Sequence, residues 1–154
     1  TSKWIEAGVQ MNVEEDSITI NSGNKYKAVN IKTLPYPGFP TDLQQPIIPF
    51  LTQCHGTSIV EETIYENRFQ NIYDTNRMGA NIMVKDNKIA KIKGVTPLRG
   101  KNVTATDLRG GASMLICGLV ADGITTIDNI KYILRGYDDI CHKLSKVGAK
   151  IEII

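Results

Sequence analysis

The sequence lacks the features that would place the chain in a membrane or on nucleic acid. No apolar run approaches the ~20 residues that a membrane-spanning helix needs, because Asp, Lys, Gln or Gly interrupts every candidate. The charge is balanced, with 18 basic against 16 acidic residues, and no block of lysine or arginine is present. Aromatic residues make up only 6% and are not interleaved with basic ones. We therefore expect neither a membrane nor a nucleic-acid partner.

Paired cysteines and metal-binding spacings are also missing. Cys54, Cys117 and Cys141 are an odd number, lie far apart and are flanked by apolar residues. The sequence has no CxxC pair, no Cys/His cluster with zinc-ligand spacing and no secretory signal at its start. His55 and His142 are isolated, and we interpret them as surface or helix-capping residues. These features predict a reduced, cytoplasmic chain without a metal, whose cysteines pack as small hydrophobes.

Several common catalytic motifs are absent as well, namely a Walker-type phosphate loop, a GxSxG elbow and an HExxH helix. What is present is the composition of a globular protein, with 42% hydrophobic and 22% charged residues. A length of 154 residues suits one compact domain and is short for two. The chain begins at Thr1, inside what reads as the last turn of a helix, so we interpret it as a piece of a longer protein.

An internal repeat organises the sequence. Gly8, Gly79 and Gly148 each follow an amphipathic helical stretch and precede alternating apolar residues, at nearly equal spacing. This pattern is typical of a helix that ends at a glycine in the left-handed region and leads into a half-buried strand. In the first two copies a second glycine, Gly23 or Gly94, closes the next strand.

A second motif is duplicated between these glycines. Thr41-Asp42-Leu43 and Thr106-Asp107-Leu108 each read as the end of a strand and the N-cap of a helix. Around them we expect the order strand, helix, strand, helix. The expected elements span residues 28–33, 43–54, 56–60 and 68–78 in one copy, and 101–105, 108–121, 123–127 and 137–147 in the other.

These units predict an α/β (α+β) fold made of repeated βαβαββ units, here incomplete. The predicted division is the tail of one repeat at 1–27, a repeat at 28–100 and a shortened repeat at 101–154. A single unit of this kind cannot bury a core alone. We therefore expect the units to pack around a shared core in which sheets cover the helices.

The loop at residues 35–42 carries the strongest candidate for chemistry. Its sequence, Pro-Tyr-Pro-Gly-Phe-Pro-Thr-Asp, contains three prolines and a glycine, which predict a rigid loop at the end of a strand. Such a loop can hold the Asp42 carboxylate at a helix start, within reach of a substrate hydroxyl. The alternative is that Asp42 only caps the helix.

Three arginines are the other candidates. Arg109 lies in the first turn of a predicted helix, where backbone N–H groups favour an anion. Arg135 follows an apolar strand, so its guanidinium should project into a cleft or into solvent, and Arg68 occupies the equivalent position of the other copy. Forked arginine donors match phosphate and carboxylate oxygens, although each could equally be an ordinary solvated side chain. We expect Asp42 and Arg135 to face a common cavity.

Five short stretches, spread over nearly the whole chain, form a specific set of motifs. They are residues 35–42 (PYPGFPTD), 62–69 (ETIYENRF), 76–80 (NRMGA), 105–109 (ATDLR) and 135–137 (RGY). Together they resemble the UDP-N-acetylglucosamine 1-carboxyvinyltransferases, a family of enolpyruvyl transferases. The resemblance implies an inverted α/β barrel built from repeats, and a cytoplasmic enzyme of peptidoglycan precursor synthesis that needs no metal or organic cofactor.

The resemblance also implies a reaction and roles for particular residues. The enolpyruvyl group of phosphoenolpyruvate would pass to the 3′-hydroxyl of UDP-N-acetylglucosamine, through a tetrahedral intermediate that loses phosphate. Asp42 would take the proton from the hydroxyl and, with Ile64, bind the nucleotide sugar. Arg135 would face the phosphate or carboxylate of phosphoenolpyruvate, with Arg109 and Arg68 in support.

Two features of that family have no counterpart in this sequence, a catalytic cysteine loop and a Lys-Asn pair near the N-terminus. The three cysteines do not match the setting of that loop. The missing N-terminal domain of the same enzyme is therefore an expected partner, and we expect the chain to be inactive alone. Two other interpretations stay open: a non-catalytic binding or structural module of the same fold, and a shikimate-type enolpyruvyl transferase.

Overall fold

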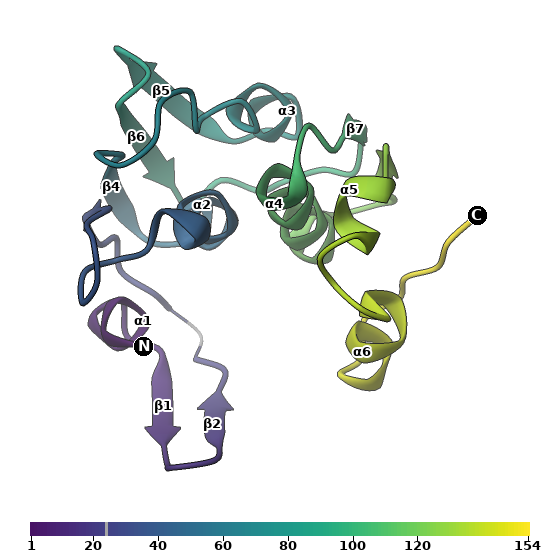
Figure 1. The fold of residues 1–154 in the computed structure, drawn as a ribbon, viewed down its shortest axis with the longest axis horizontal. Coiled ribbons are helices and arrows are strands. Elements are labelled where there is room, and N and C mark those ends of the chain that lie inside the picture. The colour runs from purple at the N-terminus through teal and green to yellow at the C-terminus, as the bar shows by residue number, and fades with distance from the viewer. Residues whose placement is uncertain (24) are drawn as a thin grey trace.

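Helices and strands are interspersed along the chain in a mixed α/β fold (Figure 1). The computed structural model describes residues 1–23 and 25–154. Its helical elements are α1 (Ser2–Glu6), the 3-10 turn η1 (Thr41–Leu43), α2 (Gln44–Thr52), α3 (Ile72–Arg77), α4 (Leu108–Val120), α5 (Lys131–Leu134) and α6 (Ile140–Lys146). Its strands are β1 (Gln10–Val13), β2 (Ile18–Asn21), β3 (Ile31–Lys32), β4 (Gly56–Glu61), β5 (Asn81–Lys85), β6 (Ile89–Gly94), β7 (Asn102–Thr104) and β8 (Thr126–Asp128).

In the described part of the chain these strands form three small sheets. β1 and β2 make an antiparallel hairpin, and β7 and β8 make a parallel pair. The largest sheet has the order β3-β4-β6-β5, in which only the β3–β4 pair is parallel. In β6, Ala90 and Ile92 are fully buried while Lys91 and Lys93 are exposed. This two-residue period turns one face of the sheet to the core and the other to solvent.

Two helices fill the middle of the fold. α2 packs against α4 and also against β6, so the strands lie around the helices (Figure 1). Ile48 and Leu51 of α2 are buried with Val60 and Ile92 of the sheet, and burying one such side chain contributes about 1.5–3 kcal/mol. Met114 and Cys117 of α4 belong to a second buried cluster. The expected arrangement of sheets covering helices is therefore found.

The three repeat glycines behave as the sequence predicts at the helix ends. Gly8, Gly79 and Gly148 have φ angles of +98°, +111° and +98°, which a residue with a side chain rarely adopts. Gly8 and Gly79 lead into β1 and β5, but residues 149–154 after Gly148 have no regular structure. The prediction of a strand after Gly148 is therefore wrong. A strand needs a hydrogen-bonded neighbour, and the described residues provide none beside this segment.

Several predicted boundaries shift for identifiable reasons. The helix expected at 68–78 begins only at Ile72, because residues 66–71 form turns in which Asn67 has a φ of +56°. The strand expected at 28–33 keeps only Ile31–Lys32, with an isolated bridge at each side. The segment before Arg135 is the helix α5 and not a strand, because Asn129, at φ +58°, turns the chain after β8.

The buried cysteines fit their expected role as small hydrophobes. Cys54 and Cys117 are fully buried, and burial raises the pKa of their thiols to about 11 and about 12. Both thiols therefore stay protonated near neutral pH, where the thiolate is the reactive form. Among the residues that the structure describes, no helix is long and apolar enough to cross a bilayer.

Candidate active site

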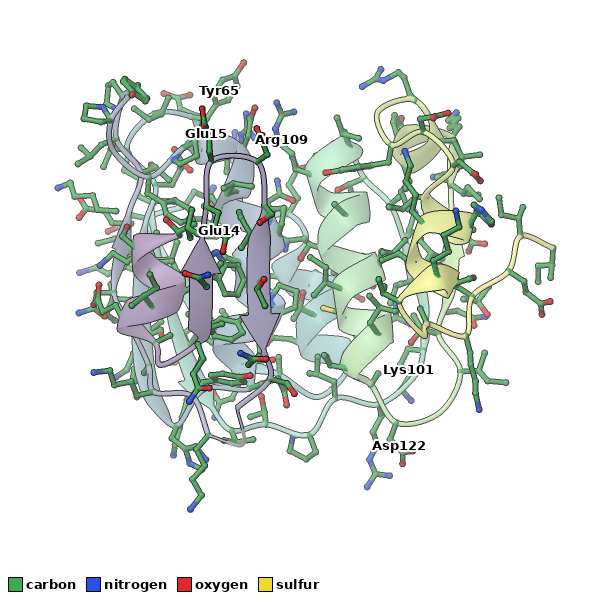
Figure 2. All side chains as sticks on the ribbon, turned by 90° about the horizontal axis from the view of Figure 1, so that it is seen from below. Glu14, Glu15, Tyr65, Lys101, Arg109 and Asp122 are labelled. Carbon is green, nitrogen blue, oxygen red and sulfur yellow. The ribbon has the colours of Figure 1, made fainter. Side chains whose placement is uncertain are left out.

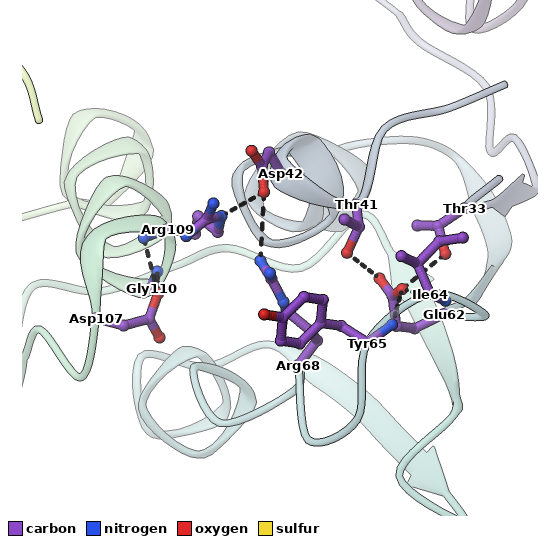
Figure 3. Close-up of polar contacts among 10 residues, drawn as sticks. All are labelled: Thr33, Thr41, Asp42, Glu62, Ile64, Tyr65, Arg68, Asp107, Arg109 and Gly110. Atoms are coloured by element: carbon purple, nitrogen blue, oxygen red, sulfur yellow. Dashed lines mark hydrogen bonds and ion pairs between the residues drawn. The ribbon is translucent and has the colours of Figure 1, made fainter. Parts of the chain in front are cut away.

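The Asp42 carboxylate lies between two guanidinium groups that come from distant parts of the chain. The Arg109 Nε–H donates a hydrogen bond to Asp42 Oδ1 over 2.6 Å, and the Arg68 Nη1 atom lies 3.7 Å from the same oxygen (Figure 3). Asp42 comes from η1, Arg109 from the first turn of α4, and Arg68 from the turns after β4. The structure thus brings together three of the residues that the sequence singled out.

The electrostatics of this cluster favour an ionised carboxylate. The hydrogen bond from Arg109 lowers the pKa of Asp42, and the charges of Arg109 and Arg68 add to the effect, against partial desolvation. The same hydrogen bond raises the pKa of Arg109. The Asp42 side chain is nonetheless 60% exposed. A ligand can therefore reach a carboxylate that the protein already holds in place.

Arg68 is the buried member of the cluster. Its side chain is only 10% exposed, and its guanidinium carbon lies 4.2 Å from the centre of the Tyr65 ring. A cation over an aromatic face is stabilised by the ring quadrupole, by about 0.5–2 kcal/mol. The Tyr65 ring itself is exposed and lies beside the Arg68 side chain (Figure 3).

Arg109 is held in place by the helix that carries it. Asp107 is the N-cap of α4, and its Oδ1 accepts hydrogen bonds from the backbone N–H groups of Arg109 (2.8 Å) and Gly110 (3.0 Å). The sequence interpretation of an N-cap is therefore confirmed for Asp107. It is wrong for Asp42, whose side chain caps neither η1 nor α2, because the helical turn begins at Thr41, directly after Pro40, and so already contains Asp42.

The sequence reading gave no role to Glu62. This residue follows β4 and is 2% exposed. Its carboxylate accepts hydrogen bonds from the Thr33 and Thr41 hydroxyls and from the backbone N–H groups of Ile64 and Tyr65 (Figure 3). The available signal was the alternation of a strand: Val60 and Glu62 lie on one face and Ile59 and Glu61 on the other, so a buried Val60 places Glu62 inside, where a charge demands several donors.

Ile64 and Arg135 lie apart from the ion pairs. Ile64 is partly exposed on the turn next to Tyr65. Arg135 is exposed at the end of α5, and in the described structure it makes no ion pair. The next residue, Gly136, packs so closely on Leu108 that an added Cβ would lie 2.5 Å from it. Arg135 therefore sits on a segment that contacts the start of α4.

Two cavities lie near Asp42 and Arg135, but neither is lined by both residues. One of about 700 Å³ is lined by residues of the 37–40 loop and by α1, but not by Asp42. The other, of about 470 Å³, is lined by Leu134 and the C-terminal residues, but not by Arg135. The expectation that Asp42 and Arg135 share a cavity stays a prediction.

The cluster occupies one end of the molecule. Figure 2 shows Tyr65 and Arg109 at one end of the view, and Lys101 and Asp122 at the opposite end. Arg109 lies in the first turn of α4 and Asp122 lies just after its last residue, Val120, so this helix runs from one end to the other. No group of three or more His, Cys, Asp or Glu side chains that could hold a metal occurs among the described residues.

Comparison with known proteins assigns the family. The sequence model of EPSP synthase (3-phosphoshikimate 1-carboxyvinyltransferase) matches residues 2–144. The chain belongs to the EPSP synthase family. Within it, the chain is 50% identical over 151 residues to UDP-N-acetylglucosamine 1-carboxyvinyltransferase 2 of Bacillus cereus. It is 51% identical over 150 residues to UDP-N-acetylglucosamine 1-carboxyvinyltransferase of Halothermothrix orenii.

The resemblance drawn from the five motifs is thereby confirmed, and so is the enolpyruvyl transferase fold. The crystal structure of the enolpyruvyl transferase NikO from Streptomyces tendae superposes with a TM-score of 0.89 at 27% identity and covers 98% of this chain. The chain spans 35% of the length of NikO and of the Bacillus cereus relative, and 36% of the Halothermothrix orenii relative.

Proposed function

We propose that this chain supplies one face of an enolpyruvyl transferase active site. The enzyme would transfer the enolpyruvyl group of phosphoenolpyruvate to the 3′-hydroxyl of UDP-N-acetylglucosamine and release phosphate. The observation that carries the proposal is the exposed Asp42 carboxylate, fixed between Arg109 and Arg68 rather than used as a helix cap. The choice of acceptor is supported by relatives, about 50% identical, whose names state this activity.

In this proposal Asp42 accepts the proton of the sugar hydroxyl. In the described structure both arginine contacts are made to Oδ1, so we assign Oδ2 to the incoming hydroxyl. The hydrogen bond from Arg109 lowers the pKa of Asp42 and so makes the free carboxylate a weak base. A substrate that draws Arg109 toward its own negative charge would weaken that bond, raise the pKa of Asp42 and strengthen the base.

The arginines serve the anionic partner. As the hydroxyl oxygen gives its proton to Asp42 and bonds to C2 of phosphoenolpyruvate, C3 would take a proton from a general acid of the complete enzyme, and a tetrahedral intermediate would form. Return of a proton from C3 to that group and cleavage of the C2–O bond to phosphate would then give the enolpyruvyl product and free phosphate. Arg68, Arg109 and Arg135 would fix the phosphate and carboxylate groups and offset the charge that develops. Ile64 would contact the nucleotide sugar beside Asp42.

The same proposal includes the expected context of the enzyme. We infer a cytoplasmic enzyme of peptidoglycan precursor synthesis, in which an N-terminal domain completes the site and residues 28–100 and 101–154 act as two repeats. The length of the relatives supports it, because this chain matches only about a third of each. We accordingly expect the chain to be inactive alone: mixed with both substrates, it should release no phosphate above the uncatalysed rate.

The second candidate is 3-phosphoshikimate as the acceptor, which the description of the matching family model favours. This candidate predicts the same half-site with a different hydroxyl bound at Asp42. Because neither acceptor has to react, binding to the chain can separate the two.

The test is a titration of the ¹⁵N-labelled chain with each acceptor, read at the Arg109 Nε–H signal. UDP-N-acetylglucosamine should shift this signal, and 3-phosphoshikimate at equal concentration should not. The backbone signals of Lys101 and Asp122, at the opposite end of the molecule, serve as internal controls and should stay in place (Figure 2). A shift with 3-phosphoshikimate alone would replace the proposal by the second candidate, and shifts spread equally over both ends would contradict a defined site.

A further inference from the structure

The Glu62 carboxylate is the common acceptor for three separate segments of the chain. Its Oε1 atom accepts from the Thr33 hydroxyl (2.8 Å), the Ile64 N–H (2.9 Å) and the Tyr65 N–H (3.0 Å). Its Oε2 atom accepts from the Thr41 hydroxyl (2.9 Å). Four donors satisfy a side chain that is only 2% exposed, which is the condition for burying a carboxylate.

Three of these hydrogen bonds, from Thr41, Ile64 and Tyr65, fix segments that carry part of the candidate site. Thr41 directly precedes Asp42, so the bond to its hydroxyl holds the carboxylate-bearing turn η1. The bond to the Tyr65 N–H holds the residue whose ring lies over the Arg68 guanidinium. Both partners of the Asp42–Arg68 pair are therefore tied to one buried carboxylate (Figure 3).

The neighbouring carboxylate, Glu61, does not take part in these hydrogen bonds. Glu61, the last residue of β4, has a half-exposed side chain and pairs with Lys32 on the surface at 3.0 Å. An exposed pair of that kind contributes between about 0 and 1 kcal/mol. Glu62, one position later, faces the interior and joins the loops instead. The two residues form a natural matched pair for experiment.

We propose that Glu62 is a positioning residue that sets the place of the Asp42 carboxylate through Thr41, and the place of Arg68 through Tyr65. The inference rests on the proposed function, because the position of Asp42 affects catalysis only if Asp42 receives the substrate hydroxyl. A misplacement of about 1 Å can reduce catalysis on the order of 100-fold, so such an anchor matters even though it touches no substrate.

The test measures where Asp42 sits in the 154-residue chain, without using activity. The pKa of Asp42 lies below 3.8 because Arg109 donates a hydrogen bond to it, so a displaced Asp42 should titrate closer to 3.8. The Glu62→Gln variant keeps the size of the side chain and can still accept at one oxygen. Its amide group, however, must donate to the Thr41 hydroxyl and thereby reverse that bond.

We expect Glu62→Gln and Thr41→Val to raise the pKa of Asp42 and to shift the Arg109 Nε–H signal. Thr41→Ser keeps the hydroxyl and should restore the wild-type pKa, and Glu61→Gln should leave it unchanged. The measurement is a pH titration of the Asp42 carboxyl ¹³C signal, with the amide spectrum as the check of folding. If Glu62→Gln unfolds the chain, Thr41→Val and Thr41→Ser decide the matter.

Folded Glu62→Gln and Thr41→Val variants with the wild-type pKa at Asp42 would overturn the inference. The outcome is independent of the proposed function. A raised pKa at Asp42, together with full turnover by an Asp42→Asn variant of the complete enzyme, would support the positioning by Glu62 while removing the catalytic role of Asp42.

Discussion

Thr41-Asp42-Leu43 and Thr106-Asp107-Leu108 are identical in sequence, and each stands at the beginning of a helix. Asp107 has an extended backbone, with φ −159° and ψ −179°, and its carboxylate accepts hydrogen bonds from the backbone of Arg109 and Gly110. Asp42 lies inside the 3-10 turn η1, and its carboxylate reaches the side chain of Arg109. Both copies of the motif thus hold Arg109. Asp107 accepts a hydrogen bond from its backbone N–H, and Asp42 accepts one from its guanidinium.

The difference arises from the residue that precedes each copy. Pro40 has φ −71° and ψ 138° and serves as the cap position of η1, so the helical turn already includes Asp42. A side chain inside the turn points away from the free N–H groups at the helix start, which a cap residue must face. The proline-rich loop therefore leaves the Asp42 carboxylate free of a capping role, whereas the equivalent carboxylate of Asp107 caps α4. Under the proposed function, one of the two copies of this motif supplies the catalytic carboxylate and the other only a helix cap.

The largest effect that this comparison predicts is on turnover. In the complete enzyme, Asp42→Asn should lower kcat by about 10²–10⁴-fold, because an amide cannot take the proton of the hydroxyl. Asp107→Asn should leave kcat nearly unchanged, since Asn caps a helix about as well as Asp. Initial rates of phosphate release measure both variants, and thermal unfolding checks their folding. Equal losses of kcat in the two variants would mean that Asp42 and Asp107 do not differ in role.

The second effect is on stability, where the change at Asp107 should matter more than the change at Asp42. Asp107→Ala removes the cap of α4 and should lower the free energy of unfolding by about 1 kcal/mol, within a range of about 0.5–2. Asp42→Ala removes ion pairs made by a side chain that is 60% exposed, which should cost less than about 1 kcal/mol. Urea unfolding of the chain at neutral pH compares the two. A larger loss at Asp42 would contradict the distinction drawn between cap and site.

Local signals in the sequence predicted the helix ends and the cap of α4 well. Glycines after amphipathic stretches report a left-handed backbone directly, and Gly8, Gly79 and Gly148 all adopt it. Asp107 before an apolar helical run is a local capping signal, and it is correct. The arginine and carboxylate candidates were also named from the sequence, and Asp42, Arg68 and Arg109 do meet in space.

What the sequence could not show depends on contacts between distant residues. Whether Asp42 caps its helix or pairs with Arg109 depends on where η1 begins and on how α4 packs beside α2. The role of Glu62 depends on Thr33 and Thr41, which lie 29 and 21 residues before it in the chain. Arg135 is expected at the end of a strand but follows the helix α5, whose four residues are too few to reveal a helical period.

The smallest predicted effect separates the two arginines that face Asp42. Arg109→Gln should raise the pKa of Asp42 toward its ordinary value of 3.8, because it removes the hydrogen bond that is the largest cause of the lowering. Arg68→Gln should raise it less, since Arg68 lies 3.7 Å away and acts only through its charge. Carboxyl ¹³C titrations of the two variants give both values, and a larger rise for Arg68→Gln would reverse the assigned order.

The sign of the linked pH effect follows from the same comparison. The pKa of Asp42 is lower in the folded chain than 3.8, so its contribution to stability is present above 3.8 and is lost as the pH falls through the folded value. Arg109→Gln should therefore flatten the acid limb of the stability curve below pH 3.8, and Arg68→Gln should change that limb less. Because the Asp42 side chain is mostly exposed, salt should weaken the difference, whereas screening should affect the part-buried capping bonds of Asp107 less.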